Sequence, residues 1–325
     1  MDSRQRQLQV ALQAARMYYY QDLPMKKIAG ELGVSHSTVS RLLAWARAEG
    51  LIEIRINDVR GRAGTLEETL RLRFGLRATQ VVPVPEVAGP QAWQERVARS
   101  AANYLQQIME SGLVLGISWG GTVNRVAAHL TPKSLFDAHV VQLNGGEIVS
   151  NPDLNHAGGL VTQVAANFEA SAHLLPVPTY FAYDETKQAL WREPSIQRIL
   201  ALQRRADILF FSIGSFEGDT ASAAYLGNYL RAEDYEEMGR LGVVGDVANI
   251  MIRADGSYED IPLNARACGP DLALFREARR AICVVSGYNK LPVLKAALTG
   301  GYNNELIIDE PTAHRLVDSA GTLPG

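Results

Sequence analysis

The segment PMKKIAGELGVSHSTVSRLLAWARAE, residues 24–49, decides how the rest of the chain is interpreted. Apolar residues recur in it at intervals of three and four, in two short runs that predict two amphipathic helices. Gly33 lies between the runs and allows the left-handed backbone that ends a helix. Ser35 follows as a good N-cap for the second helix, and small Ala29 lets the two helices approach closely. The segment therefore predicts a helix-turn-helix.

The outer face of the second predicted helix has the character of a DNA-reading surface. It is short-chained and polar near its N-terminus and basic farther along, which suits a helix that enters the major groove. Two lysines open the first helix, and LIEIRI (residues 51–56) alternates apolar and charged residues, which predicts the strand of a wing. The alternative is an ordinary helical hairpin whose charges are solvated. We expect the DNA-binding residues to be Lys26, Lys27, Ser35, His36, Ser37, Thr38, Ser40, Arg41, Arg47 and Arg55.

The charge distribution favours a small DNA-binding module joined to a larger domain. The chain has 325 residues, which exceeds a single average domain. Residues 1–62 carry ten Lys and Arg against six Asp and Glu, whereas the remainder carries 22 against 29. A basic head on an acidic body fits a local contact with double-stranded DNA.

Composition also argues against several classes of protein. There is no run of about eighteen apolar residues, so we expect no transmembrane span. The first residues, MDSRQRQLQ, lack the apolar core of a secretory signal, which predicts a cytoplasmic protein. Cys268 and Cys283 adjoin small or apolar residues and are expected to be buried thiols. The six histidines show no ligand spacing, so we expect no metal and no cofactor.

From residue 65 onward, strand-like apolar runs alternate with helical segments. This alternation predicts a doubly wound α/β domain whose parallel sheet is covered on both faces. The segment VANIMIRADGSYEDIPL (residues 247–263) departs from the pattern and predicts a hairpin around Asp255–Gly256. We expect a winged helix-turn-helix in residues 1–57, a linker in residues 58–64 and the α/β domain in residues 65–325.

The segment LGISWGGTVNRVAAHL, residues 115–130, is the most informative part of the large domain. A buried strand ends there and turns directly into a helix. Gly120 and Gly121 allow backbone N–H groups to converge on a ligand, and Ser118 and Thr122 add hydroxyl donors. The helix N-terminus adds about 0.3–1 kcal/mol for an anion. The loop predicts a phosphate site; the alternative is a plain strand-to-helix turn. No G-K-[ST] follows, which argues against nucleotide hydrolysis.

Ligands of doubly wound sheets bind beyond the carboxyl ends of the strands, and other residues there are candidates. Lys290, in SGYNKLP, could supply a positive charge to the phosphate, and Asp246, in VVGDVAN, could accept hydrogen bonds from ligand hydroxyls. Asn144 ends the strand that follows the glycine loop and is a weaker candidate. The alternatives are a solvated lysine and a turn cap. Trp119 is expected to pack against the sheet edge, and His156 to bond the backbone of its own loop.

Together, these segments resemble the SorC family of bacterial transcriptional regulators. The matching stretches are IAGELGVSHSTVSRLLAWARAEGLIEI, LGISWGGTVNRVAAHL, VVQLNGG, GDVAN and SGYNKLPVLKAALTGGYNNELIIDEPTAHRLV, which run in order over nearly the whole chain. The resemblance implies a Rossmann-like effector domain akin to glucosamine-6-phosphate deaminase and ribose-5-phosphate isomerase. It also implies a phosphorylated sugar as effector, and assembly of the chain as a homodimer or homotetramer.

The resemblance further implies which residues contact the effector. The phosphate loop corresponds to Ser118, Gly120, Gly121 and Thr122, and the acid and lysine beside the ligand correspond to Asp246 and Lys290. Some relatives carry a lysine where this chain has Asn144. A Schiff base between that position and an open-chain sugar is therefore not available here, and the effector can differ from theirs.

The leading hypothesis is a transcriptional regulator whose operator binding is controlled by a phosphorylated sugar. The rival is a sugar-phosphate isomerase or deaminase that carries a DNA-binding head. Catalysis of that kind needs an acid–base pair beside the substrate carbonyl. The sequence suggests none, since Asp246 has no evident partner and His156 lies on a different loop. A third hypothesis, a purely architectural DNA-binding protein, would give the glycine loop no function.

Overall fold

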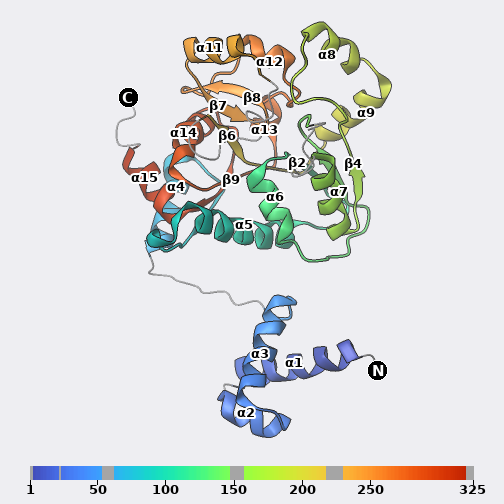
Figure 1. Ribbon diagram of the computed structural model, residues 1–325, viewed down its shortest axis with the longest axis vertical. Helices are drawn as coiled ribbons and strands as arrows, with labels where there is room; N and C mark the ends of the chain where they lie inside the picture. Colours follow the sequence, from blue (N-terminus) through green and yellow to red (C-terminus); the bar gives the residue numbers. More distant parts are fainter. Residues whose placement is uncertain (1–2, 22, 53–61, 147–156, 217–229, 320–325) are drawn as a thin grey trace. The chain divides into compact units, whose positions relative to one another are not determined.

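The computed structural model describes residues 3–21, 23–52, 62–146, 157–216 and 230–319 (Figure 1). The chain divides into two compact units, residues 1–59 and residues 60–325. Helix α4 (Arg62–Phe74) opens the second unit. Residues 62–64, which the sequence assigned to a linker, therefore belong to a helix, and the predicted linker extends too far toward the C-terminus.

The first unit is a three-helix module that contains the predicted helix-turn-helix. Its helices are α1 (Ser3–Tyr19), α2 (Met25–Leu32) and α3 (His36–Ala48). Gly33 has φ 64°, and the Val34 N–H bonds the Ala29 carbonyl at 3.0 Å, which closes α2. The Ser35 hydroxyl accepts the Thr38 N–H at 3.1 Å and caps α3. Both sequence signals for the turn are confirmed, whereas the predicted wing strand falls mostly on residues outside the described ranges.

The second unit is built on a seven-stranded parallel sheet, as the alternation of strands and helices predicts. Its strands, in spatial order, are β1 (Ala78–Val82), β10 (Glu305–Asp309), β9 (Arg280–Val285), β5 (Ile208–Phe211), β2 (Val114–Ile117), β3 (His139–Gln142) and β4 (Ser171–His173). The chain adds strands outward from β2 to β4, then returns to β5 and builds in the opposite direction. The topological switch point thus lies between β2 and β5, which pair directly.

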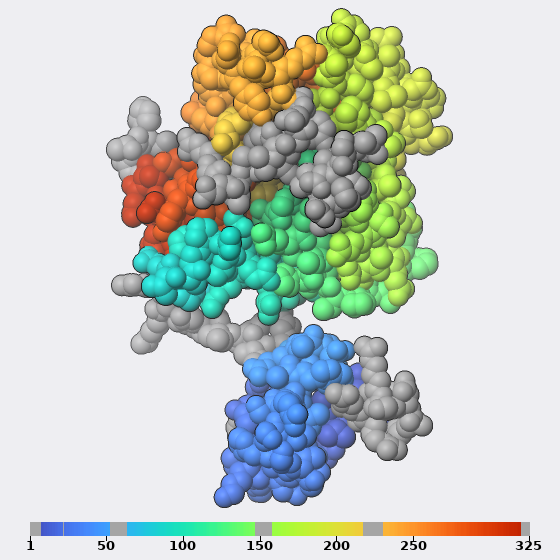
Figure 2. Space-filling model, viewed as in Figure 1, coloured from blue at the N-terminus to red at the C-terminus, as the bar shows by residue number. Residues whose placement is uncertain are grey.

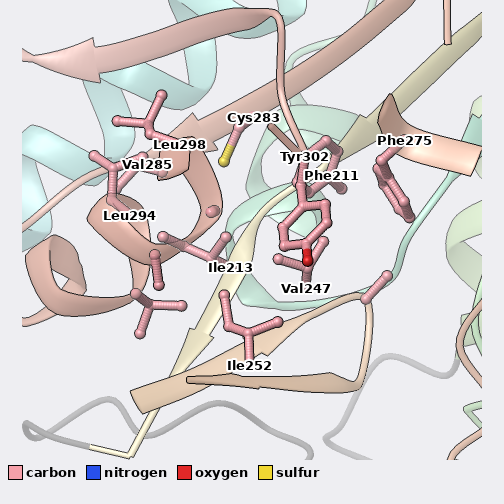
Figure 3. Packing of buried hydrophobic residues seen from close by; sticks show 14 of the residues in the cluster. Phe211, Ile213, Val247, Ile252, Phe275, Cys283, Val285, Leu294, Leu298 and Tyr302 are labelled. Carbon is pink, nitrogen blue, oxygen red and sulfur yellow. The ribbon is translucent and has the colours of Figure 1, made fainter. Parts of the chain in front are cut away.

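Two helical layers cover this sheet. Helices α5 (Gly89–Ile108), α6 (Gly121–Ala128) and α7 (Ala157–Phe168) lie against one face and form much of the surface seen in Figure 2. Helices α4, α14 (Leu291–Thr299) and α15 (Glu310–Ser319) lie against the other. Strand β5 shows the pattern: Phe210 enters the core beneath α5 and α6, and Phe211 enters the opposite core beside Cys283 and Tyr302 (Figure 3).

A three-stranded antiparallel sheet adjoins the core on the α4, α14 and α15 side of the parallel sheet. It consists of β6 (Ile213–Ser215), β7 (Val243–Val247) and β8 (Ile250–Arg253). The hairpin between β7 and β8 turns at Ala248 and Asn249, with φ 48° and 71°, values typical of a type I′ turn. The sequence placed the hairpin at Asp255–Gly256. These residues do form a tight turn, but no second strand follows it, so this prediction was wrong.

The remaining elements include several that the sequence did not reveal. Helices α8 (Asp184–Trp191) and α9 (Pro194–Gln203) pack on a small separate core that contains Val177, Ile196 and Cys268. The shorter elements are η1 (Glu86–Ala88), α11 (Ala232–Arg240), α12 (Pro262–Arg266), α13 (Ala273–Glu277) and η2 (Tyr288–Lys290). Both cysteines are free and buried, as predicted. Among the described residues, no helix is long and apolar enough to cross a bilayer.

Replacing Gly214 by alanine tests the close packing of β6 against β7, where the chain passes from the parallel to the antiparallel sheet. A methyl group at this position of β6 would overlap the carboxylate of Asp246 on β7. We expect Gly214→Ala to lower the free energy of unfolding by about 1–3 kcal/mol, the usual effect of overpacking, in urea denaturation. The matched control is Gly159→Ala on α7, where an added methyl meets no atom within 4 Å. The control should leave the free energy of unfolding unchanged or raise it by up to about 1 kcal/mol. Equal effects of the two changes would show that Gly214 is not packed closely against Asp246.

Candidate functional site

The surface of α3 presents the predicted DNA-binding side chains to solvent. Val39, Leu43 and Ala46 are buried on its inner side. The exposed residues of the predicted set are Lys26, Lys27, Ser35, His36, Ser37, Ser40, Arg41 and Arg47, and Thr38 is half-buried. The Arg47 Nε also bonds the Leu43 carbonyl at 3.3 Å, which holds the base of its side chain along the helix. Arg55 lies outside the described residues.

The glycine loop leaves the sheet at the topological switch point. It follows β2, whose neighbours are β5 on one side and β3 on the other. The Ser118 N–H bonds the Phe210 carbonyl of β5 at 3.1 Å, and the Leu143 N–H after β3 bonds the Ile117 carbonyl at 3.0 Å. Ser118 itself is buried. The loop is thus anchored on both sides at the place where doubly wound sheets bind ligands.

The two glycines leave open space in front of α6. Gly120 has φ 157° and ψ 164°, a conformation essentially confined to glycine, and it is the N-cap residue of α6. A methyl group added at Gly120 or Gly121 would meet no atom of the described residues within 4 Å. Packing within the protein therefore does not require a glycine at Gly121. The first N–H groups of a helix have no partner within the helix, so they can hold an anion there.

A chain of hydrogen bonds joins this loop to two other segments. The Trp119 N–H donates to Asn144 Oδ1 at 3.2 Å, and the Trp119 indole Nε1 donates to the Gly145 carbonyl at 2.7 Å. Asn249, at the β7–β8 turn, donates from Nδ2 to the same carbonyl at 3.3 Å. Its backbone N–H in turn donates to Asp246 Oδ1 at 2.8 Å. The structure therefore connects three of the predicted site segments, which are far apart in sequence.

Asp246 and Lys290 both contact strand β6. The Asp246 carboxylate is buried against Gly214, and the Lys290 ammonium donates to the Ile213 carbonyl. Burial lowers the pKa of Lys290, and the nearby carboxylate of Asp246 opposes that shift. Burial, with Asp246 as the next cause, raises the pKa of Tyr180 well above its ordinary value. That Lys290 contacts a phosphate stays a prediction, because the described bond of its ammonium is to the protein backbone.

The sequence analysis missed Asn249 and the hydrogen-bonding role of Trp119. Trp119 is half-buried beside the α5–α6 core, but its two N–H groups also join the glycine loop to the exit of β3. Asn249 joins Asp246 to Gly145, and only its place in the segment GDVAN marked it. His156 lies outside the described residues. Within the ranges that the structure describes, no group of three His, Cys, Asp or Glu side chains could hold a metal ion.

The fold defines a class of protein: a helix-turn-helix unit joined to an α/β domain with a candidate ligand site at its topological switch point. Comparisons with known proteins agree. Residues 61–318 match the family model "Putative sugar-binding domain", and residues 2–53 match the model "Homeodomain-like domain". The deoxyribonucleoside regulator of Bacillus subtilis is 32% identical over 313 residues, covering 95% of this chain and 97% of that protein. The sorbitol operon regulator of Klebsiella pneumoniae is 25% identical over 311 residues, covering 95% of this chain and 98% of that protein.

Solved structures show the same relationship. The full-length sorbitol operon regulator SorC from Klebsiella pneumoniae aligns with a TM-score of 0.72 and 25% identity, covering 95% of this chain and 99% of that one. A domain of a "possible sugar-binding transcriptional regulator" from Arthrobacter aurescens aligns with a TM-score of 0.73 and 38% identity, covering 79% and 98%. This chain belongs to the SorC family, and it is an effector-controlled, DNA-binding transcriptional regulator.

Replacing Trp119 by phenylalanine tests the contact between the glycine loop and β3. An aromatic ring is kept, although a smaller one, and the Nε1 donor to the Gly145 carbonyl is lost. We expect the free energy of unfolding to fall by about 0.5–1.5 kcal/mol in urea denaturation, the net worth of one hydrogen bond. Trp93→Phe is the matched control, because it loses a similar bond, at 3.0 Å, to the Pro85 carbonyl. Both changes should destabilise alike, and only Trp119→Phe should also weaken ligand binding; equal ligand binding would show that this bond does not shape the site.

Proposed function

We propose that a phosphorylated sugar binds at the carboxyl edge of the parallel sheet and thereby controls the binding of α3 to operator DNA. The observation that carries the proposal is the open glycine loop at the switch point, where Gly120 and Gly121 expose the N-terminus of α6. A phosphate group matches this end of a helix in charge and in hydrogen bonding. The proposed contacts are Ser118, Gly120, Gly121, Thr122, Asn144, Asp246 and Lys290.

The names of the relatives support a sugar-derived effector. The matched family model describes sugar binding, and two relatives are named for deoxyribonucleosides and for sorbitol. The relatives are named as transcriptional regulators, which supports a regulatory rather than a catalytic role for this chain. Turnover of a bound sugar phosphate by the purified protein would favour the isomerase or deaminase hypothesis instead.

Control of DNA binding requires two arrangements of the protein with different affinities for the effector. We propose a cytoplasmic homodimer or homotetramer, because two recognition helices must match two half-sites about 10–10.5 base pairs, or a multiple of this, apart. An effector that favours one arrangement changes the separation of the two α3 helices. Operator affinity then follows effector concentration without direct contact between the two ligands.

Replacing Gly121 by alanine separates a phosphate site from a plain turn. The added methyl group meets no protein atom within 4 Å, so we expect the stability of the ligand-free protein to change little. The same methyl group would occupy the space in front of α6 and reduce phosphate binding. The measurement is a thermal-shift series with ribose 5-phosphate, glucose 6-phosphate, fructose 6-phosphate and their unphosphorylated parents. A ligand at a hundredfold excess over Kd stabilises by about 2.7 kcal/mol.

The wild type should respond to at least one phosphate ester and not to its parent, and Gly121→Ala should lose that response. Gly159→Ala, on the exposed side of α7, is the control and should respond like the wild type. A full response of Gly121→Ala would place the phosphate elsewhere. No response of the wild type to any ester would contradict the phosphorylated effector itself.

Replacing Arg41 by alanine tests the DNA-binding surface. Arg41 is exposed on α3, on the side opposite buried Val39 and Leu43. We expect weaker operator binding. If Arg41 contacts a phosphate, the slope of log affinity against log salt concentration should also become shallower by about one. Fluorescence anisotropy over a range of salt concentrations measures both. Arg96→Ala, exposed on α5, is the matched loss of charge and should leave DNA binding unchanged. Wild-type affinity and salt dependence in Arg41→Ala would remove this residue from the interface.

A further inference from the structure

Asp309 joins helix α15 to the end of strand β9 through one buried carboxylate. It is the last residue of β10, has 0% relative exposure and directly precedes α15. Its Oδ1 accepts the Thr312 N–H at 2.8 Å, which caps the N-terminus of α15. Its Oδ2 accepts the Gly287 N–H at 2.9 Å and the Thr312 hydroxyl at 2.9 Å. Both oxygens of the carboxylate are therefore used, and for different purposes.

A helix cap accounts for only one of these two oxygens. Serine and asparagine cap helices as well as aspartate does, and each caps with a single acceptor oxygen. The second oxygen of Asp309 reaches the neighbouring strand, because β9 and β10 pair in parallel with Ile308 opposite Val285. A hydrogen bond between a backbone N–H and a carboxylate is roughly twice as strong as one between neutral groups. The second oxygen thus ties Gly287 to the start of α15.

Gly287 is a residue whose conformation has to be held by its surroundings. Its φ of 101° and ψ of 146° lie in a region that other residues rarely adopt, and glycine itself has many other conformations open to it. The Gly287 carbonyl accepts the Lys290 N–H at 3.1 Å, within the short helix η2. Asp309 therefore fixes the N–H of the residue whose carbonyl bonds the backbone of Lys290.

Tyr288 and Asn289, which complete the segment 287–290, are held as well. The guanidinium carbon of Arg315, on α15, lies 3.4 Å from the centre of the Tyr288 ring, a cation–π contact. The Asn289 carbonyl accepts the Ser215 hydroxyl of β6 at 2.9 Å. Helix α15 thus contacts this segment twice, through the carboxylate at its start and through an arginine farther along.

We propose that Asp309 is a positioning residue for the effector site: by fixing Gly287, it holds Lys290 where its ammonium group meets the phosphate of the effector. The inference rests on the proposed function and extends it to a residue that acts through Lys290. The sign of the effect separates positioning from simple electrostatics. Removing a negative charge near a phosphate would by itself tighten phosphate binding, whereas a displaced lysine weakens it.

The test is a double-mutant cycle between Asp309 and Lys290. Asp309→Asn keeps one oxygen for the α15 cap, but its NH2 group cannot accept the second N–H. The probe is whichever of ribose 5-phosphate, glucose 6-phosphate and fructose 6-phosphate gives the largest thermal shift with the wild type. Calorimetry gives its dissociation constant for the wild type, Asp309→Asn, Lys290→Ala and the double variant. We expect Asp309→Asn to bind about fivefold or more weakly, and to have no further effect once Lys290 is replaced.

A matched control separates positioning from a general loss of stability. Asp207 Oδ2 accepts the Val114 N–H at 2.9 Å, so Asp207→Asn removes a bond of the same kind. Asp207 precedes β5 and Val114 begins β2, which places this bond at the amino end of the sheet. The control should lower the free energy of unfolding in urea denaturation and leave the dissociation constant of the ester unchanged.

A second variant covers the case in which Asp309→Asn does not fold. Thr312→Val keeps the shape of the side chain and removes the hydroxyl that bonds Asp309 Oδ2 and also accepts the Gly287 N–H at 3.2 Å. It should weaken ester binding, and this loss should again disappear once Lys290 is replaced. Thr312→Ser keeps the hydroxyl and should retain wild-type affinity.

The outcomes keep this inference apart from the proposed function. If none of the esters binds the wild type, the phosphorylated effector is wrong, and the inference is wrong with it. If an ester binds and Asp309→Asn binds it as tightly as the wild type or more tightly, only the positioning role is wrong. Equal losses with and without the Lys290 side chain would make Asp309 a purely structural residue and overturn the inference. Wild-type affinity of Lys290→Ala would remove the lysine from the site and the positioning role with it.

Discussion

Burial of the central strands on both faces is the constraint on which the rest of the α/β unit depends. Every residue of β2, β5 and β10 is buried. A strand of this kind has no room for an unpaired polar side chain along its length, so polar groups collect where it ends. Ser118 and Asn144 follow the ends of β2 and β3, and Ser286 follows the end of β9. Because the strands are parallel, these positions meet at a single edge, and the candidate ligand site results from the topology.

The antiparallel sheet brings a carboxylate to that edge. Strand β6 begins one residue after β5 ends, so the chain leaves the parallel sheet and pairs with β7 at once. Asp246 on β7 lies opposite Gly214, the only kind of residue that leaves room for its side chain. The type I′ turn that follows presents Asn249 to the Gly145 carbonyl. The antiparallel sheet beside the main sheet thus adds a hydrogen-bond acceptor, Asp246, to a candidate site whose other groups are mainly donors.

The sequence predicted local features well and contacts between distant segments poorly. Gly33 and Ser35 define the helix-turn-helix because a left-handed residue and a cap act within one turn of the chain. The β7–β8 hairpin escaped detection because Ala248 is an unusual residue at positive φ, and Asp255–Gly256 offered a stronger turn signal nearby. Tertiary pairing overrode that local signal. The hydrogen bond between Trp119 and Asn144 joins residues 25 positions apart, and neither segment alone predicts it. Its place at the end of a strand made Asn144 a candidate, and the structure adds its contact with the glycine loop.

In the proposed function, an effector would bond groups at the candidate site that the protein itself does not pair. The Asn144 amide keeps a donor unpaired in the interior, Gly120 holds a conformation open to glycine alone, and the first N–H groups of α6 have no partner in the helix. Of these features, the unpaired Asn144 donor carries a free-energy cost, because glycine adopts the conformation of Gly120 without strain. An effector that satisfies these groups stabilises the arrangement in which they are correctly placed, and it has no such effect on an arrangement that displaces them. Such a difference in affinity between two arrangements is what effector control of α3 requires. Under the proposed function, bonds to such groups would supply the free energy by which a small ligand acts on DNA binding.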